Sequence, residues 1–407
     1  MESPIKRKIM GDIVKRPIKV AVLGTRGIPD VQGGVETHCQ HLFPRLAQLG
    51  FEITLFARKG YVKNDESYQY QGIRVVPLKC CHRACFESVS HTWRCLKAVR
   101  KMRPDIVHIH AIGPAMFAPL FRMIGVKVVY THHGQDYMRA KWGRFAKFTL
   151  RMGEWLGTKF SHRIIVISDY IQSFLKRTYK TDRTVLIRNG VEIRMDAPKD
   201  ESFTLAHFGL EPKKYILACG RFVEEKGFHD LIAAYEKLDS ELQKKYKLVI
   251  AGKPDHTSAY SRKLVEQANA ANVVLTGFIS GDTLCAVQRN ARLFCIPSYH
   301  EGLPIALLEA LSYNLDVVAS DIPANTEVPL PRTCFAKVGD TDSIAKIITA
   351  HLENDVQVNF ASIIHEYYDW DKIAEQTALV YRELAVRPYA ELRNRLSSPS
   401  ASKPVIL

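Results

Sequence analysis

Short apolar runs alternate with amphipathic stretches along this chain, in two blocks that a polar segment at residues 192–213 separates. In the first block, an apolar run at 18–24 is followed by apolar residues at helical spacing and then by a second apolar run at 51–57. This order is a βαβ unit, which needs a parallel sheet. Later runs are apolar at nearly every position, which is typical of strands covered by helices on both faces. The sequence therefore predicts an α/β fold.

The second block restarts the same alternation, so we predict two Rossmann-like, doubly wound domains that face each other across a cleft. The N-terminal domain is placed at 17–195 and the C-terminal domain at 196–368. The amphipathic segment 369–392 predicts a helix that packs across the domains, and 393–407 predicts a disordered tail. Ligands of such sheets bind beyond the carboxyl ends of the strands, so the cleft is the expected site.

Positive charge is concentrated in the first half of the chain. The net charge is +15, and residues 1–195 carry 34 Lys and Arg against 14 Asp and Glu, while 196–407 carry 23 against 28. Nucleic acid, an anionic membrane or a phosphate-bearing substrate would each suit this surplus. The basic, aromatic-rich stretch 137–163 suits an anionic lipid surface, although the exterior of a core helix would look similar. No nucleic-acid module is recognisable, so nucleic acid is not the expected partner.

The expected location is the cytoplasm, peripheral on the inner face of the plasma membrane. Nine cysteines are irregularly spaced without a CxxC pair, which favours reduced thiols over disulfides or a zinc site. The sequence shows no secretory signal and no apolar run of about 18 residues, the length a membrane span needs.

The segment 298–312 has the features of a phosphate-binding helix start. Glu301 and Glu309 lie eight positions apart, and the segment from Ile305 has apolar residues at helical spacing. Pro304 is predicted in the first turn, where its missing N–H costs nothing. The free backbone N–H groups of such a start suit an anion. The alternative is a capped core helix with Glu309 in solvent.

Two further loops follow predicted strands. Arg221 and Lys226 come after an apolar run at 215–219, where two cations beside a helix start suit a diphosphate; a solvated basic loop is the alternative. His132 and His133 follow another run, and neighbours in an extended chain point to opposite faces, so one is expected in the cleft and the other in the core.

The loop near the N-terminus contains Gly27, Gly33 and Gly34 but lacks the GxGxxG pattern of dinucleotide sites. Its paired glycines can still bring backbone N–H groups close to a ligand, and a plain flexible loop is the alternative.

Metal binding is not expected. His108, His110, His132 and His133 lack a cysteine or carboxylate partner at helical spacing, which disfavours zinc. Asp340 and Asp342 flank a threonine in a pattern that can hold a divalent ion, but they directly precede a predicted helix, where aspartate is a favoured cap.

Over residues 18–385, these motifs resemble in order those of glycosyltransferase family 4, the retaining GT-B transferases that use nucleotide sugars. The matching segments are GTRGIPDVQGGVETH, THHGQDYMRAKWGR, IRNGVEI, GRFVEEKGFHDLI, EGLPIALLEAL and DIPANTEV. The first two also resemble a bacterial branch, similar to rhamnosyltransferases, that builds surface polysaccharides. The chain departs from the family at Arg188, where proline is frequent, and at His132, where an apolar residue is usual.

The resemblance implies roles for particular residues. Arg221 and Lys226 would hold the donor diphosphate, Glu309 would bind the ribose hydroxyls, and His133 and Glu301 would lie beside the reacting sugar as catalytic candidates. The implied donor-binding set is Arg221, Lys226, Gly302, Leu303, Pro304, Ile305 and Glu309, and the implied phosphate and acceptor loop is Gly33 with Gly34. Two cations at the diphosphate make a metal or other cofactor unnecessary in principle.

The implied reaction moves a sugar, of hexosyl or rhamnosyl type, from a UDP-, GDP- or dTDP-linked donor to a saccharide or lipid-linked saccharide, with retention, in surface polysaccharide synthesis. Two alternatives stay open. One is a sugar-nucleotide epimerase of the same fold, which would turn over its substrate without an acceptor. The other is a protein that binds membranes or polyanions without catalysis.

Overall fold

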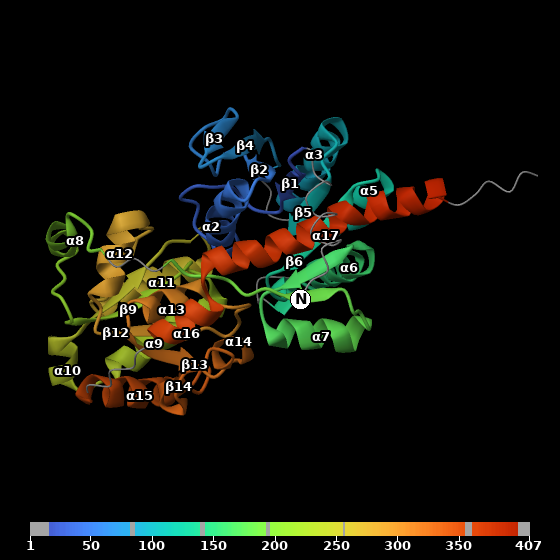
Figure 1. Ribbon diagram of the computed structural model, residues 1–407. Coiled ribbons are helices and arrows are strands. Elements are labelled where there is room, and N and C mark those ends of the chain that lie inside the picture. Colours follow the sequence, from blue (N-terminus) through green and yellow to red (C-terminus); the bar gives the residue numbers. More distant parts are fainter. Residues whose placement is uncertain are drawn as a thin grey trace, which may run out of the picture.

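The computed structural model describes residues 16–81, 86–138, 143–192, 196–254, 257–354 and 360–397, and it contains two β-sheets (Figure 1). The first sheet has eight strands in the order β3-β4-β2-β1-β5-β6-β7-β8, and the second has six in the order β11-β10-β9-β12-β13-β14. Neighbouring strands in these two sheets are parallel, except β3 and β4. The predicted α/β fold of two Rossmann-like domains is confirmed.

The strands follow the apolar runs of the sequence. The first sheet consists of β1 (Lys19–Leu23), β2 (Glu52–Arg58), β3 (Tyr68–Tyr70), β4 (Ile73–Leu78), β5 (Ile106–His110), β6 (Lys127–His132), β7 (Arg163–Val166) and β8 (Thr184–Leu186). The second consists of β9 (Tyr215–Cys219), β10 (Lys247–Ala251), β11 (Val274–Gly277), β12 (Leu293–Ile296), β13 (Asp316–Ser320) and β14 (Phe335–Ala336). In the middle of the first sheet, Val20 stands opposite both Ile53 and Ile106, and all three are buried.

Helices connect the strands. The first domain has α2 (Gly34–Gln48), α3 (Glu87–Met102), α4 (Ile112–Ala115), α5 (Ala118–Met123), η1 (Asp136–Met138), α6 (Arg144–Phe160) and α7 (Asp169–Tyr179). The second has α8 (Glu201–His207), η2 (Glu224–Lys226), α9 (Phe228–Glu236), α10 (Ser240–Lys245), α11 (Ala259–Ala270), α12 (Gly281–Arg289), α13 (Ile305–Ser312), α14 (Pro323–Thr326), η3 (Arg332–Cys334), α15 (Thr341–Glu353) and α16 (Ala361–Tyr367). Asp340 caps α15 by accepting a bond from the Ser343 N–H at 3.0 Å, so the predicted cap is confirmed.

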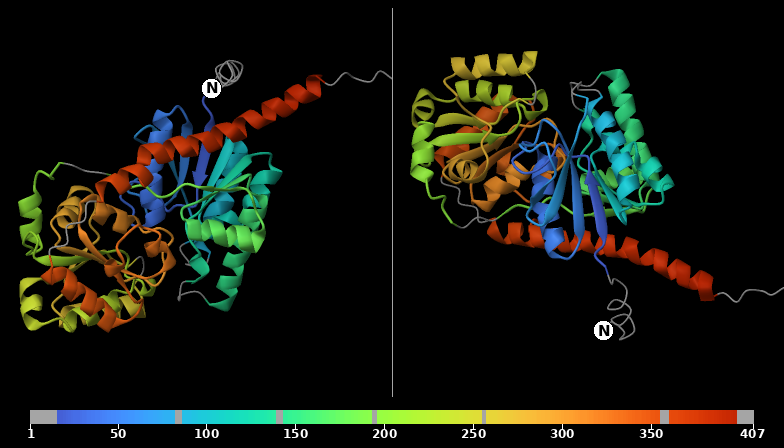
Figure 2. Two further views of the ribbon diagram at one scale, coloured as in Figure 1. Left: turned by 60° about the horizontal axis from the view of Figure 1, so that its bottom comes forward. Right: turned by 90° about the horizontal axis from the view of Figure 1, so that it is seen from above.

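The last helix, α17 (Trp370–Ser397), leaves the second domain and runs along the first (Figure 2). Its buried side chains join the core cluster that contains α2: Trp370, Ile373, Ala374, Ala378, Val380, Tyr381 and Leu384. The Tyr381 hydroxyl lies 2.5 Å from Nδ1 of His108 on β5. The prediction ended this helix at residue 392, whereas α17 continues to Ser397; the rest of the predicted tail, 398–407, lies outside the described residues.

The strand β3 and the helix α8 are among the elements that were not predicted. β3 forms a hairpin with β4 through a two-residue loop, Gln71 and Gly72, which both have the positive φ of a type I′ turn. α8 lies inside the polar segment 192–213 that separates the two blocks of the sequence, and its Leu205 is buried against the rest of the second domain.

The domains are joined at the junction by packing and by hydrogen bonds. One apolar cluster contains Ile167 and Val191 of the first domain together with Leu303 of the second. The Val191 N–H donates to the carbonyl of Tyr368 at 2.8 Å. The loops that follow the strand ends are therefore held against each other.

Candidate active site

Charged side chains gather beyond the carboxyl ends of β9 and β12 in the second domain. Arg221 and Lys226 follow β9, and Glu301 follows β12. The Lys226 ammonium lies 2.6 Å from Oε1 of Glu301. The Ser298 hydroxyl donates to the same oxygen at 2.6 Å. Two motifs that are far apart in the sequence thus meet in one charged group.

Glu301 is held as a carboxylate. Burial raises the pKa of Glu301, but the charge of Lys226 and the hydrogen bonds from Lys226 and Ser298 outweigh burial, so that the pKa lies below its ordinary value. The side chains of Lys226 and Glu301 are only 18% and 12% exposed, and a pair with so little water around it interacts more strongly than one on the surface. This carboxylate is not a proton donor near neutral pH.

The helix α13 begins one residue later than predicted. Pro304 is its N-cap residue rather than part of the first turn, and the Pro304 carbonyl accepts from the Leu307 N–H at 3.1 Å. The start of the helix still presents backbone N–H groups suited to an anion. Glu309 is partly buried, and Gln288 donates to its Oε2 at 3.0 Å, so Glu309 is not the solvated residue of the alternative interpretation.

The first-domain side of the junction is lined by histidines. His132 is fully buried and pairs with Glu154 at 2.8 Å, while His133 is partly exposed, and its Nε2 lies 2.8 Å from Nδ1 of His110. The two adjacent histidines therefore differ as predicted: one belongs to the core. Burial and the neighbouring imidazoles lower the pKa values of His110 and His133 well below the ordinary value, so both rings are neutral.

Gly302 brings the two sides into contact. A side chain at this position would collide with the carbonyl oxygen of His133. A side chain at Gly134, which follows His133, would likewise contact the backbone of Gly302. The predicted catalytic candidates therefore belong to two loops whose backbones touch.

A buried ion pair orders the glycine-containing loop after β1. Arg26 Nε lies 3.2 Å from Oε1 of Glu36, and the Arg26 N–H donates to the same oxygen at 3.0 Å. Burial raises the pKa of Glu36. The charge and hydrogen bonds of Arg26 and, to a smaller extent, the charge of Arg221 across the junction outweigh burial, so the pKa lies below its ordinary value. Gly33 lies beside this ion pair and has a φ of +148°. A side chain at Gly33 would collide with the Glu36 carboxylate, whereas Gly34 has open space around it. The loop is thus more than a flexible connection.

Sequence reasoning missed His38 and gave no role to Asn189. His38 lies on α2, and its ring centre is 4.9 Å from that of His133. Its Nδ1 lies 3.0 Å from Oδ1 of Asn189, whose Nδ2 donates to the carbonyl of Leu303 at 2.9 Å. His38 follows Gly34 by one helical turn, and that spacing places it at the same helix end.

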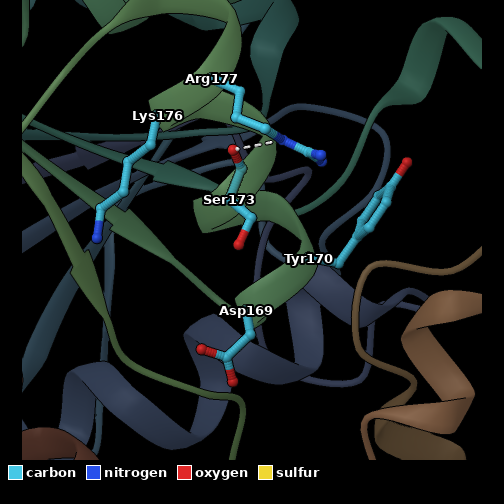
Figure 3. A pocket seen from close by; sticks show the side chains of 5 residues that line it. All are labelled: Asp169, Tyr170, Ser173, Lys176 and Arg177. Atoms are coloured by element: carbon cyan, nitrogen blue, oxygen red, sulfur yellow. Dashed lines mark hydrogen bonds between the residues drawn. The ribbon is translucent and has the colours of Figure 1, made fainter.

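A shallow surface hollow on α7 contains none of the predicted site residues. Its lining comes from α7 alone (Figure 3): Asp169, Tyr170, Ser173, Lys176 and Arg177. Asp169 is paired with Arg188 at 2.5 Å, which gives the unusual arginine before Asn189 a structural role. We therefore place the candidate site at the junction.

Comparisons with known proteins find similarity to glycosyltransferases. The family model described as Glycosyltransferase Family 4 matches residues 32–194, and the model described as Glycosyl transferases group 1 matches residues 204–369. An uncharacterized glycosyltransferase of Methanocaldococcus jannaschii is 26% identical over 396 residues, 90% of this chain and 98% of its own. The phosphatidyl-myo-inositol mannosyltransferase of Mycolicibacterium smegmatis is 25% identical over 379 residues, 88% and 92% of the two chains. HepE of Anabaena, solved in complex with UDP-glucose, shares the fold with a TM-score of 0.73 and 17% identity over 90% of this chain and 100% of its own.

Proposed function

The chain belongs to the family 4 glycosyltransferases with the GT-B fold, and from this premise we propose that it transfers a sugar from a nucleotide sugar to an acceptor hydroxyl with retained anomeric configuration. The observation that carries the proposal is the ion pair of Lys226 and Glu301, 2.6 Å apart at the strand ends of the second domain. Through Gly302 this pair adjoins His133 of the first domain. Cations for a diphosphate and polar groups for a sugar are therefore neighbours.

Arg221 and Lys226 bind the donor diphosphate in this proposal, and the start of α13, from Gly302 to Ile305, adds backbone N–H groups for phosphate oxygens. Negative charge builds on the diphosphate as the bond to the sugar breaks. Two cations fixed beforehand stabilise that charge more than they stabilise the bound donor, which lowers the barrier. Transfer by this route uses no metal at the diphosphate. Glu309 binds the ribose hydroxyls.

Glu301 and His133 are the residues proposed beside the donor sugar. Since Glu301 is ionised, it can stabilise positive charge that develops on the sugar carbon, but it does not protonate the leaving group. The neutral ring of His133 can hydrogen-bond a sugar hydroxyl. Gly33 and Gly34 bring backbone toward the phosphate and the acceptor.

The donor and acceptor classes are part of the proposal. A UDP-, GDP- or dTDP-linked hexose or rhamnose is the proposed donor, supported by the UDP-glucose complex of HepE. A lipid-linked saccharide of a bacterial surface polysaccharide is the proposed acceptor, supported by the lipid named for the mycobacterial relative.

The helix α6 supports a peripheral position on an anionic membrane. Phe145, Phe148, Met152 and Trp155 form an exposed stripe at helical spacing, among basic residues of the same helix. Apolar side chains beside basic ones suit the boundary between headgroups and acyl chains. No helix in the described part of the chain is long and apolar enough to span a membrane. We propose the inner face of the plasma membrane as the location.

The transfer reaction is tested with a panel of UDP-, GDP- and dTDP-sugars, offered with and without lipid-linked saccharide acceptors. Release of the nucleoside diphosphate that requires the acceptor, with one donor preferred and the anomeric configuration retained by NMR, is expected. Conversion of the nucleotide sugar into its epimer without an acceptor would instead identify an epimerase. Glu309→Ala should raise the KM for the donor, and unchanged kinetics would contradict the ribose role.

The membrane proposal is tested by flotation with vesicles that contain phosphatidylglycerol. The paired change Phe145→Ser and Phe148→Ser should abolish flotation while sugar transfer to a soluble acceptor continues. Phe203→Ser, at an exposed phenylalanine of α8 in the other domain, is the matched control. Equal flotation of all three proteins would contradict the role of α6.

A further inference from the structure

Three histidines from separate elements of the first domain converge at the junction. His38 lies on α2, His110 ends β5, and His133 follows β6. Each offers a ring nitrogen, and the three nitrogens lie within 4.8 Å of one another. Ring centres are 4.9 Å apart for His38 and His133 and 5.1 Å apart for His110 and His133. His38 was not among the four histidines considered for zinc from the sequence.

We propose that His38, His110 and His133 form a binding site for a transition-metal ion that favours imidazole, such as Zn²⁺ or Co²⁺. Three nitrogen ligands suit these ions, whereas Mg²⁺ and Ca²⁺ favour oxygen ligands. Three protein ligands also leave one tetrahedral position open for water or another oxygen.

The orientation of His38 supports the site. Asn189 uses its Nδ2 to donate to Leu303, so its Oδ1 faces His38 and accepts from Nδ1 at 3.0 Å. The lone pair of His38 then lies on Nε2. That atom is buried and has no hydrogen-bond partner among the residues that the structure describes. A histidine fixed through one ring nitrogen, with the other one free, has the arrangement usual for metal ligands.

His110 is the second buried histidine of the cluster, and its two ring nitrogens have different surroundings. Its side chain has no exposed surface, and within the described ranges its Nε2 also lacks a hydrogen-bond partner. Its Nδ1 is 2.8 Å from Nε2 of His133, closer than the separation of about 3.3 Å that two ligands need at metal–nitrogen distances near 2.0–2.1 Å. The rings must therefore turn slightly apart as the ion enters, and the hydrogen bond between them is given up.

An ion at this site should slow sugar transfer, and this consequence alone rests on the proposed function. His133 is the residue proposed to contact the donor sugar, and a ring nitrogen bound to a metal cannot also hydrogen-bond a sugar hydroxyl. The ion would thus act as an inhibitor of the transferase.

The test uses the full chain, freed of metal with EDTA and then dialysed. Titration with Zn²⁺ by calorimetry should give one tight ion per chain, and Co²⁺ should give the visible absorption of a tetrahedral site. X-ray absorption of the zinc form should count three imidazoles. His38→Phe and His110→Phe should each weaken binding at least tenfold, while His207→Phe, at an exposed histidine of α8, should not. Thermal melting verifies that each variant folds.

Two outcomes would overturn the site: absence of stoichiometric Zn²⁺ binding by the folded protein, or equal affinity in His38→Phe, His110→Phe and His207→Phe. Transfer assays with and without Zn²⁺ form a separate arm. Binding without inhibition would uphold the site and overturn its link to transfer. Absence of transfer under all conditions would contradict the proposed function and leave the binding result intact.

Discussion

The two sides of the domain junction carry different chemistry, although each lies at the carboxyl edge of a parallel sheet. On the second-domain side, Lys226 and Glu301 are ionised and paired at 2.6 Å. On the first-domain side, His38, His110 and His133 are neutral. The fold provides two equivalent edges, and the side chains placed there make one suitable for a diphosphate and the other for uncharged groups.

The difference has a physical cause. A buried charge persists when an opposite charge compensates the loss of water, as Lys226 does for Glu301. In the part of the chain that the structure describes, His38 bonds to an amide and His110 to another imidazole, so a proton on these rings would be uncompensated. His132, next to His133, instead faces the buried carboxylate of Glu154. One step along the backbone thus changes the electrostatic surroundings of a histidine.

The largest expected effect comes from loosening the start of α17, the helix that leaves the second domain and packs on the first. Trp370 is 2% exposed, packs against Gly190, and has its ring centre 5.5 Å from that of His38. Trp370→Ala should lower the free energy of unfolding by about 3–5 kcal/mol, because it leaves a large cavity. Urea denaturation measures the change.

A matched control for this prediction is Trp93→Ala on α3, where the side chain is 49% exposed. Its effect should stay within about 1 kcal/mol, as for most surface changes. Equal losses in the two variants would show that Trp370 does not hold the junction.

Removing the charge of the second-domain side should have the next largest effect. Lys226→Met should lower kcat by about 100- to 1000-fold, the usual cost of losing one group that stabilises transition-state charge. Initial rates with the preferred nucleotide sugar measure it. The control is Lys237→Met, whose ammonium pairs with the exposed Asp342 at 2.7 Å. If Lys226→Met retained more than a tenth of the wild-type kcat, the charged side would not carry the diphosphate.

The sequence predicted the charged side more completely than the imidazole side. Arg221 and Lys226 follow the apolar run 215–219, and Glu301 follows the apolar run 293–298. Parallel strands bring their carboxyl ends to one edge, so local pattern and topology suffice to group these three residues. The ion pair between Lys226 and Glu301 needed the loop conformations, which local pattern does not determine. The same holds for Pro304, which caps α13 instead of entering its first turn.

The histidine cluster could not be predicted from the sequence because it depends on three-dimensional packing. His38 is on a helix, His110 and His133 are at strand ends, and only the packing of α2 on the sheet brings the three together. The β3–β4 hairpin was missed for a different reason. Its loop holds Gln71 at a positive φ, and glutamine rarely adopts that conformation, so the residue type does not indicate the turn.

Separating the two backbones should have a smaller effect. Gly302→Ala adds a methyl group where the His133 carbonyl lies, so the loops must move apart. The expected loss of stability is about 1–3 kcal/mol, as for overpacked sites, with a higher KM for the donor. Gly143→Ala, with open space around it, is the control. Full activity and stability of Gly302→Ala would show that the loops do not need this contact.

A histidine that has a carboxylate partner should behave in the opposite way to the cluster, with the smallest effect of the series. In the second domain, His351 Nδ1 lies 2.6 Å from Asp316 and Nε2 lies 3.0 Å from the carbonyl of Thr333. The hydrogen bond to Asp316 raises the pKa of His351 above its ordinary value of 6.5 despite burial. Its contribution to stability is therefore complete below pH 6.5 and is lost as the pH rises through the folded-state pKa.

Urea denaturation from pH 6 to pH 9 should show a decline in the free energy of unfolding of the wild type that His351→Gln lacks, and an NMR titration should place the His351 pKa above 6.5. A decline of equal size in both proteins would assign it to other groups, and a pKa below 6.5 would mean that burial outweighs the effect of the Asp316 carboxylate.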